Sequence, residues 1–378
     1  MTVLPHGPDT GNDEVLGAGA LPTAYARLSA VRTFLPRASA ARAAALLLLV
    51  AACGGSGAAP TPPATAAVTS PSATPTKAPN IRVANPYSLT LDAQERVIVA
   101  DGQGKRVVLL DPQTGTGTSL ASGGLVFPIH VAFDKNGAMF LADVDAYQVK
   151  KIGSNGETTP FLGTGKEGKG GAVGAPTAID IPWVYGIAFD AKNDMIFIES
   201  PVGGGSVRKL ETATGKITTI AEGFNEPHGL TLDSAGRYIV ADTKNHRIVR
   251  VDPASGAVAT IAGDRERKGF AGDGGPATAA TLDQPRQVSY DKNGNLFFAD
   301  DATNRVRKIG TDGVITTVAG DGSTNISGDG GPALAAGMRG VWGIIVNAAG
   351  DLYIASPPAA RVRKVDAKTG IITSVGTP

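Results

Sequence analysis

A pattern of about 50 residues recurs six times along this chain, and each copy carries the signals of four short strands. Each copy begins with alternating apolar and polar residues that reverse at a turn, as in IHVAFDKNGAMFLAD from Ile129. A basic and apolar alternation follows, such as NRVRKIG at Asn304–Gly310, and then a second Gly turn and a relative of GVITTVAG. Period-two alternation predicts strands, and Asn-Gly or Asp-Gly pairs predict tight hairpins. The copies begin at Tyr87, Ile129, Tyr185, His228, Arg286 and Trp342.

Six four-stranded units in residues 80–378 predict an all-β fold, a six-bladed β-propeller of four-stranded antiparallel blades. A lone blade would leave both of its faces in water, whereas in a closed ring each blade is covered by its two neighbours. Fifty glycines, 25 prolines and 5% aromatic residues also favour short strands and turns over helices.

Two segments, ADTKNHRIVRVD at Ala241–Asp252 and ADDATNRVRKIG at Ala299–Gly310, resemble NHL repeats. Together with GDGGPA, NLFFAD and GVITTVAG, they are similar to secreted bacterial NHL propellers. The resemblance covers Asn80–Pro378 and implies a six-bladed ring. The first three units depart from it, since Glu199 stands where other units have Asp.

The hexapeptide GDGGPA occurs twice, at Gly272 and Gly328. A glycine-rich phosphate loop needs a strand before it and a helix after it, and here a strand follows each copy. We therefore interpret the hexapeptide as the seam between consecutive blades. Asp273 and Asp329 are expected to cap their own turns through backbone N–H groups, with calcium binding there as the alternative.

The N-terminal part has the features of an export signal followed by a lipidation site. The apolar run AAALLLLVAA at 43–52 has basic residues before it and small residues after it, and it is too short for a permanent membrane span. Val50–Cys53 resembles a bacterial lipobox, which implies lipidation of Cys53; the alternative is a buried helix with a chance cysteine. The long segment before Arg37 fits a translation start downstream, such as Val31.

These features divide the chain into a signal region at 1–52, a lipidated Cys53 with a disordered Pro/Thr/Ala-rich tether at 53–79, and the propeller at 80–378. We expect a monomer that is attached to the outer face of a bacterial membrane through its lipid alone.

The charge balance and the cysteine count exclude some classes of partner and metal site. Without residues 1–52 the chain has 31 basic residues (35 minus four) and 31 acidic residues (34 minus three), so it has no electrostatic footprint for nucleic acid. Its single cysteine excludes an internal disulfide or a thiolate metal cluster within this chain.

The loops that lead into the innermost strands surround one mouth of the central channel, and they carry the candidate site. Large aromatic or hydrogen-bonding side chains gather there, as a ligand site requires, although they could instead plug the channel. The predicted ligand is a protein, peptide or glycan that is bound without turnover and without a cofactor. The candidate ligand-binding residues are Tyr87, His130, Tyr185, His228, Arg286 and Trp342.

The alternative function is a metal-dependent hydrolase or lyase that holds one divalent ion such as Ca²⁺ or Zn²⁺. Resemblance to amidating-lyase propellers would use His130 and His228 as zinc ligands, but a one-residue difference in register should send these side chains in opposite directions. Resemblance to gluconolactonase-like propellers would use Asp180, Asn225 and Glu226.

An aspartate recurs at the end of the second strand of several units. Four copies in equivalent places indicate a structural role, and we expect them to accept hydrogen bonds from the following turn and its arginine. The aspartates are Asp101, Asp143, Asp242 and Asp300, and the arginines are Arg106, Arg247 and Arg305. His246, on one of these turns, is expected to be solvent-exposed.

Overall fold

The computed structural model describes residues 82–112, 114, 116–168 and 175–375, which fall within one compact unit, Thr65–Pro378. The predicted signal region at 1–52, Cys53 and the tether at 53–79 lie outside the described residues. Among the described residues, no helix combines the length and the apolar character needed to cross a bilayer.

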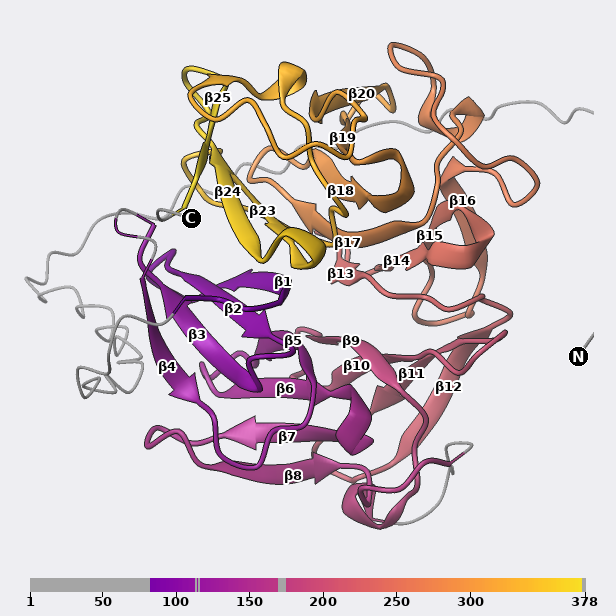
Figure 1. Cartoon of the computed structure of the whole chain (residues 1–378). Coiled ribbons are helices and arrows are strands. Elements are labelled where there is room, and N and C mark those ends of the chain that lie inside the picture. Colours follow the sequence, from indigo (N-terminus) through magenta and orange to yellow (C-terminus); the bar gives the residue numbers. More distant parts are fainter. Residues whose placement is uncertain (1–81, 113, 115, 169–174, 376–378) are drawn as a thin grey trace, which may run out of the picture. The chain divides into compact units, whose positions relative to one another are not determined.

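Six antiparallel sheets follow one another around a ring, from indigo to yellow in Figure 1. Blade 1 contains β1 (Pro86–Leu91), β2 (Val97–Asp101), β3 (Arg106–Leu110) and β4 (Gly117–Ala121). Blade 2 contains β5 (Pro128–Phe133), β6 (Met139–Asp143), β7 (Gln148–Ile152) and β8 (Thr158–Leu162). Blade 3 contains β9 (Val184–Phe189), β10 (Met195–Glu199), β11 (Ser206–Leu210) and β12 (Ile217–Glu222).

The second half of the ring repeats this arrangement. Blade 4 contains β13 (Leu230–Leu232), β14 (Tyr238–Asp242), β15 (Arg247–Val251) and β16 (Val258–Gly263). Blade 5 contains β17 (Pro285–Tyr290), β18 (Leu296–Asp300), β19 (Arg305–Ile309) and β20 (Ile315–Ala319). Blade 6 contains β22 (Gly343–Val346), β23 (Leu352–Ser356), β24 (Arg361–Val365) and β25 (Ile371–Ser374), with a short fifth strand, β21 (Gly331–Pro332), on its outer edge.

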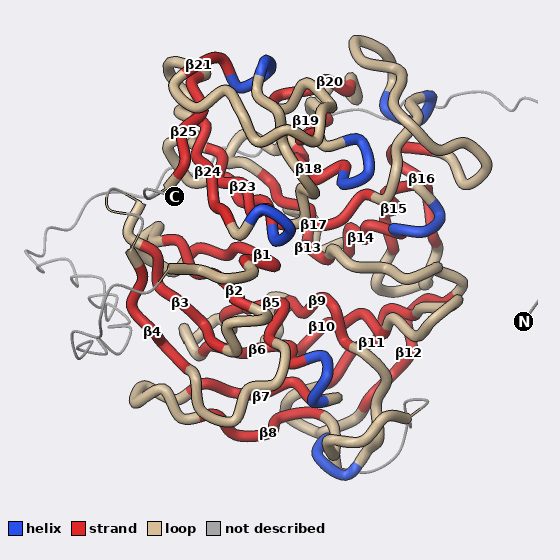
Figure 2. Tube along the Cα trace, in the orientation of Figure 1, coloured by secondary structure: helices blue, strands red, loops and turns tan. Residues whose placement is uncertain are grey.

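The helices of the described residues are single 3₁₀ turns in the connections, drawn blue in Figure 2. They are η1 (Val144–Ala146), η2 (Pro176–Ala178), η3 (Thr243–Asn245), η4 (Ala277–Ala279), η5 (Asp301–Thr303), η6 (Ala333–Ala335) and η7 (Pro357–Ala359). The predicted six-bladed fold of four-stranded antiparallel blades is therefore confirmed, with β21 as an addition.

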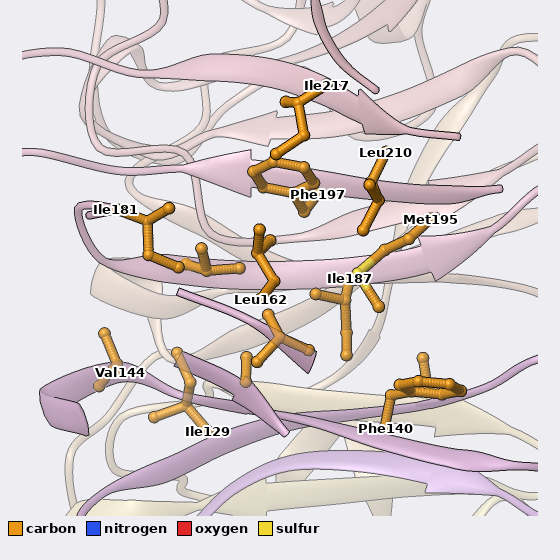
Figure 3. Close-up of a cluster of buried hydrophobic side chains, with 14 of the residues drawn as sticks. Ile129, Phe140, Val144, Leu162, Ile181, Ile187, Met195, Phe197, Leu210 and Ile217 are labelled. Carbon is orange, nitrogen blue, oxygen red and sulfur yellow. The ribbon is translucent and has the colours of Figure 1, made fainter. Parts of the chain in front are cut away.

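The core consists of six apolar layers, one at each junction between neighbouring blades, rather than one central mass. Figure 3 shows the layer between blades 2 and 3, where Phe140 and Leu162 lie opposite Ile187 and Phe197. The layer between blades 1 and 6 contains Leu89 and Tyr353, from opposite ends of the propeller sequence. Hydrophobic burial at that junction closes the ring.

The first strand of each blade is the innermost one and packs against the first strands of its neighbours. At the closing junction, β22 approaches β1 so closely that a Cβ on Gly343 would lie 3.0 Å from the carbonyl oxygen of Tyr87. A side chain at that contact would force the neighbouring backbone to move by a few tenths of an ångström.

The GDGGPA segments are seams, as predicted, but their aspartates do not cap their own turns. Instead, each segment folds against the outer edge of the blade that follows it: Gly274 N–H donates to Ile315 O, and Pro276 bridges Val314. Asp273 accepts two hydrogen bonds from Arg307 and one from the Thr317 N–H. The segment thus covers backbone groups that an edge strand would otherwise leave unpaired.

The recurring aspartates have a structural role, and Asp242 accepts from the Asn245 side chain in the following turn, as predicted. Other donors to these aspartates lie outside the following turn. Asp101 accepts the N–H groups of Ala84 and Asn85, which lie in the segment leading into the blade rather than in the following turn. The corresponding N–H donors to the other three aspartates are Val126 and Phe127 for Asp143, Asn225 for Asp242, and Asp283 for Asp300. We call each aspartate, with these contacts, a clamp.

The expected arginine joins the clamp in two of the three cases. Arg106 pairs with Asp101 at 2.9 Å and Arg247 pairs with Asp242 at 2.8 Å. Arg305 does not pair with Asp300 and donates to the carbonyl oxygens of Thr303 and Asp321 instead. Burial then raises the pKa of Asp300 to about 7.

Replacing Arg307 should reveal how strongly a seam holds its blade. Arg307 is fully buried and donates to Asp273 and to the carbonyls of Thr281 and Ala271. We expect Arg307→Leu to lower the free energy of unfolding by roughly 3 kcal/mol, because it orphans these acceptors. The urea midpoint of the purified protein measures this loss.

Arg267→Leu is the matched control, because the Arg267 side chain is 57% exposed and pairs only with nearby Asp264. Surface pairs of this kind contribute about 0–1 kcal/mol. Equal midpoints for the two variants would contradict the assigned role of Arg307.

Candidate ligand-binding site at the channel mouth

Several of the innermost strands begin with a β-bulge, and three predicted mouth residues, Tyr87, Tyr185 and Arg286, lie in these bulges. In blade 1, Pro86 pairs with Asp101 and Ser88 pairs with Ala100, so Tyr87 is an extra residue between them. The same shift surrounds Ile129 in blade 2 and Tyr185 in blade 3. A bulge re-aims the side chain at its extra residue, and here the affected side chains point toward the channel.

All six candidate residues line one hollow at the mouth. The hollow is about 20 Å³ in volume, room for about one water molecule, so the side chains fill most of the hub themselves. The lining residues are Tyr87, Ser88, Ile129, His130, Tyr185, His228, Gly229, Arg286, Gln287 and Trp342.

Gln287 closes the floor of the hollow by joining three blades. Its Nε2 donates to Leu89 O at 2.6 Å, and its Oε1 accepts the N–H groups of Leu89 and Ile344, both at 3.1 Å. On the other side of the floor, His130 Nδ1 accepts the N–H of Ile187 at 3.4 Å. Both polar side chains are thus bonded to the backbone of neighbouring blades.

Aromatic rings form one wall of the mouth. Tyr87 meets Trp342 edge-on with ring centroids 4.8 Å apart, and it lies 6.4 Å from Tyr185. Tyr185 stacks on the imidazole of His228 at 4.2 Å. Such contacts contribute about 0.5–1.5 kcal/mol each beyond area burial, which holds the wall rigid.

Arg286 joins the aromatic wall to the polar groups. Its guanidinium lies 4.3 Å from the centroid of the Trp342 ring, pairs with Asp301 at 2.6 Å, and contacts His228 Nδ1 at 2.6 Å. A guanidinium can only donate, so Nδ1 of His228 is the acceptor and the neutral ring carries its proton on Nε2.

Burial sets the ionisation state of the mouth. It lowers the pKa of His130 to about 4, and burial together with the nearby Arg286 charge holds the pKa of His228 well below its usual value. Burial also raises the pKa of the Tyr87 hydroxyl above its usual value. At neutral pH the mouth therefore presents neutral imidazoles and phenols around one arginine.

Both histidines considered as zinc ligands lie at the mouth. Their one-residue difference in register is real, since His130 and Gly229 occupy equivalent places opposite Ala142 and Ala241. Despite this difference, both histidines line the same hollow.

The three weak metal candidates do not line this hollow. Asp180 is exposed and accepts the Thr164 hydroxyl, while the backbone N–H groups of Asn225 and Glu226 bond to Asp242 and Gly204. In the described part of the chain, no group of three or more His, Cys, Asp or Glu side chains is placed to hold a metal ion.

Sequence reasoning missed three residues of the mouth: Asp301, Phe127 and Trp183. Asp301 fixes Arg286, while Phe127 and Trp183 extend the aromatic wall beside Tyr87 and Tyr185. Phe127 and Trp183 each lie two residues before a mouth residue, a position that the repeat alignment would have singled out. His246, expected to be exposed, instead accepts the Gln284 N–H.

Comparison with known proteins identifies the repeat. The family model "NHL repeat" matches residues 224–251, and "Teneurin NHL domain" matches residues 267–327, which includes the first GDGGPA copy. Together with the six-bladed ring, these matches decide the family. The protein is an NHL-repeat β-propeller.

Relatives of this NHL propeller differ widely in length and type. Teneurin-3 of Danio rerio is 32% identical over 122 residues, which cover 28% of this chain and 4% of that protein. The chain therefore spans only a small part of such curated relatives.

Two solved structures share the fold at lower identity. An auxiliary nutrient binding protein from Bacteroides thetaiotaomicron has a TM-score of 0.60 at 16% identity, covering 78% of this chain and 70% of that one. A gluconolactonase from Xanthomonas campestris has a TM-score of 0.52 at 14% identity, covering 73% and 86%. At such identities the likeness concerns the fold alone.

The state of His228 can be tested directly by NMR. We expect the ring to stay neutral, protonated on Nε2, from pH 8 down to pH 5, because burial and Arg286 both oppose a second proton. The unfolded chain does take up that proton below about pH 6.5, so His228 makes stability fall as the pH drops.

Long-range ¹H–¹⁵N correlation spectra of the imidazole rings measure both tautomer and titration, with His228→Gln used to assign the signal. His246 serves as an internal comparison. A His228 midpoint near 6.5, or a proton on Nδ1, would contradict the network.

Proposed function

We propose that the NHL propeller is a binding module that recognises a protein, peptide or glycan at its channel mouth, without turnover. The observation that carries this proposal is the convergence of Tyr87, Tyr185, His228, Arg286 and Trp342 on one hollow. Aromatic faces beside a fixed arginine are a combination that occurs repeatedly at recognition surfaces.

The size of the hollow favours surface recognition over enclosure of a small molecule. Pockets that enclose drug-sized ligands measure about 300–1,000 Å³, far above the 20 Å³ available here. A ligand would therefore lay one side chain or sugar ring over the mouth, contacting the aromatic edges and accepting hydrogen bonds from Arg286. Because Arg286 is fixed by Asp301, little side-chain entropy would be lost on binding.

The proposed setting is the outside of a bacterial membrane. In this proposal Cys53 carries the lipid and residues 53–79 form the tether, which reaches about 80 Å if extended as polyproline II. Structures of nutrient-binding propellers with the same fold are consistent with a role in ligand capture.

A metal-dependent hydrolase or lyase is the second candidate. The observation that favours it is the presence of both His130 and His228 at one hollow, in a fold shared with a gluconolactonase. The two candidates differ in one measurable property: the hydrolase or lyase requires a stoichiometric divalent ion, which elemental analysis of the purified protein detects.

Substitutions at the mouth should weaken ligand binding while leaving the fold intact. We expect Trp342→Ala, and the double variant Arg286→Gln/Asp301→Asn, to weaken binding at least tenfold, since each removes a central contact. The double variant removes both charges of the buried pair, so that neither is left unpaired.

The probes are a glycan array and a phage-displayed peptide library, followed by affinity measurement on the strongest hit. Arg267→Gln, on a distant exposed loop, is the control and should bind as the wild type does. Unchanged affinity in both mouth variants would exclude the mouth as the site.

Lipidation is tested separately in a bacterial expression host. With metabolic labelling by radioactive palmitate, the wild-type chain should be labelled and Cys53→Ser should not, because Cys53 is the only cysteine. Ser56→Ala should keep the label. A labelled Cys53→Ser chain, or an unlabelled wild type, would refute the anchor.

A further inference from the structure

A comparison of equivalent clamps around the ring singles out blade 6. The last residue of the second strand pairs with the first residue of the third strand in every blade, and in blades 1, 4 and 5 this pair joins an aspartate to an arginine. In blade 6 the pair is Ser356 and Arg361, so the arginine is kept but the carboxylate is missing.

Serine cannot take over the role of the aspartate carboxylate, because it carries no negative charge and its hydroxyl acts as a donor here. The Ser356 hydroxyl donates to the carbonyl oxygen of Arg339, in the segment leading into the blade. An aspartate at this position would instead accept from that segment and from the arginine, as Asp101 does with Arg106. The carboxylate that accepts from the equivalent arginine in blades 1 and 4 is therefore absent beside Arg361.

The nearest carboxylate to Arg361 is already engaged elsewhere. Asp329 lies 3.8 Å from Arg361, but its Oδ1 accepts from Arg363 and its Oδ2 accepts the Ser374 hydroxyl. By contrast, the Arg106 and Arg247 guanidinium groups lie within 2.9 Å of their clamp aspartates.

A second difference from blade 5 concerns the space beside Arg361. In blade 5 the ring of Phe270 lies 3.8 Å from the Arg305 guanidinium, whose donors are also taken by two carbonyl oxygens. Ile326 occupies the place of Phe270 in the repeat before blade 6, and its shorter side chain cannot stack over Arg361 in this way.

A hollow of about 10 Å³ lies beside Arg361. Its lining includes the apolar residues Met338 and Ile354 and three arginines. Arg339, Arg361 and Arg363 all line it, and Asp329 is the single carboxylate within ion-pair distance of any of them among the described residues. Three guanidinium groups and one carboxylate give the lining a net positive charge, and the Arg361 guanidinium is partly exposed.

We propose that the surface around this hollow in blade 6 is a subsite for a carboxylate group of a ligand, in the role that aspartate has beside the arginines of blades 1 and 4. Arg361 would hold the carboxylate through its planar fork, as arginine does in bidentate pairs, and the exposed Arg339 would add charge. The subsite is argued independently of the channel mouth.

Acetate is the simplest probe of this subsite. In ¹H–¹⁵N spectra of the arginine Nε–Hε groups, we expect a saturable shift of the Arg361 signal with acetate and none with chloride at equal ionic strength. Arg361→Gln assigns that signal. No saturable shift up to 100 mM acetate would overturn the proposal.

Ser356→Asp is the decisive variant, because it restores the carboxylate that the other clamps contain. We expect it to weaken acetate binding at Arg361 at least tenfold, with the Arg361 signal already moved in the acetate-free protein. Ser234→Asp, on an exposed turn of blade 4, adds the same charge elsewhere and should change nothing. Equal acetate affinity in the wild type and Ser356→Asp would refute the subsite.

Discussion

The burial of both faces of every blade by its neighbours is the constraint on which this structure depends. Each of the six apolar layers is shared by two blades, so removing one blade would expose two faces. The layer that holds Leu89 and Tyr353 must therefore form between the two ends of the propeller sequence. Glycine at the innermost position of blade 4 follows from this closure, since a Cβ on Gly229 would lie 2.2 Å from Arg286 O.

Closure also explains why polar side chains occupy the hub. Six inner strands converge on a narrow axis, and their bulged first residues project into a space that they nearly fill. Gln287 satisfies backbone groups of blades 1 and 6 there, and Arg286 is held by Asp301 and His228. A network whose donors and acceptors are paired is rigid, which suits recognition of a ligand from outside more than enclosure of one.

The sequence predicted the parts that depend on local repetition. Strand alternation and turn residues determined the number of blades, and alignment of the copies placed Tyr87, Tyr185, His228, Arg286 and Trp342 at one mouth. What it could not give depends on pairing between distant strands. The bulge at Ile129 is a register shift between two strands, and the partners of Asp101 and Asp273 lie across a blade edge.

Repetition further explains how single units can diverge without loss of the fold. A clamp fixes the segment leading into its blade, but the apolar layers hold the blade on both faces, so one clamp is dispensable to the ring. Blade 3 replaces aspartate with Glu199, whose carboxylate pairs with the buried Arg208 rather than with backbone N–H groups. Blade 6 has no carboxylate at this position at all, because Ser356 is uncharged, whereas Arg361 is present as in blades 1, 4 and 5. A repeated scaffold that holds an arginine on its strand, with only the shared Asp329 at 3.8 Å as a partner, suits a site that recognises negative charge, since little has to be displaced when a ligand binds.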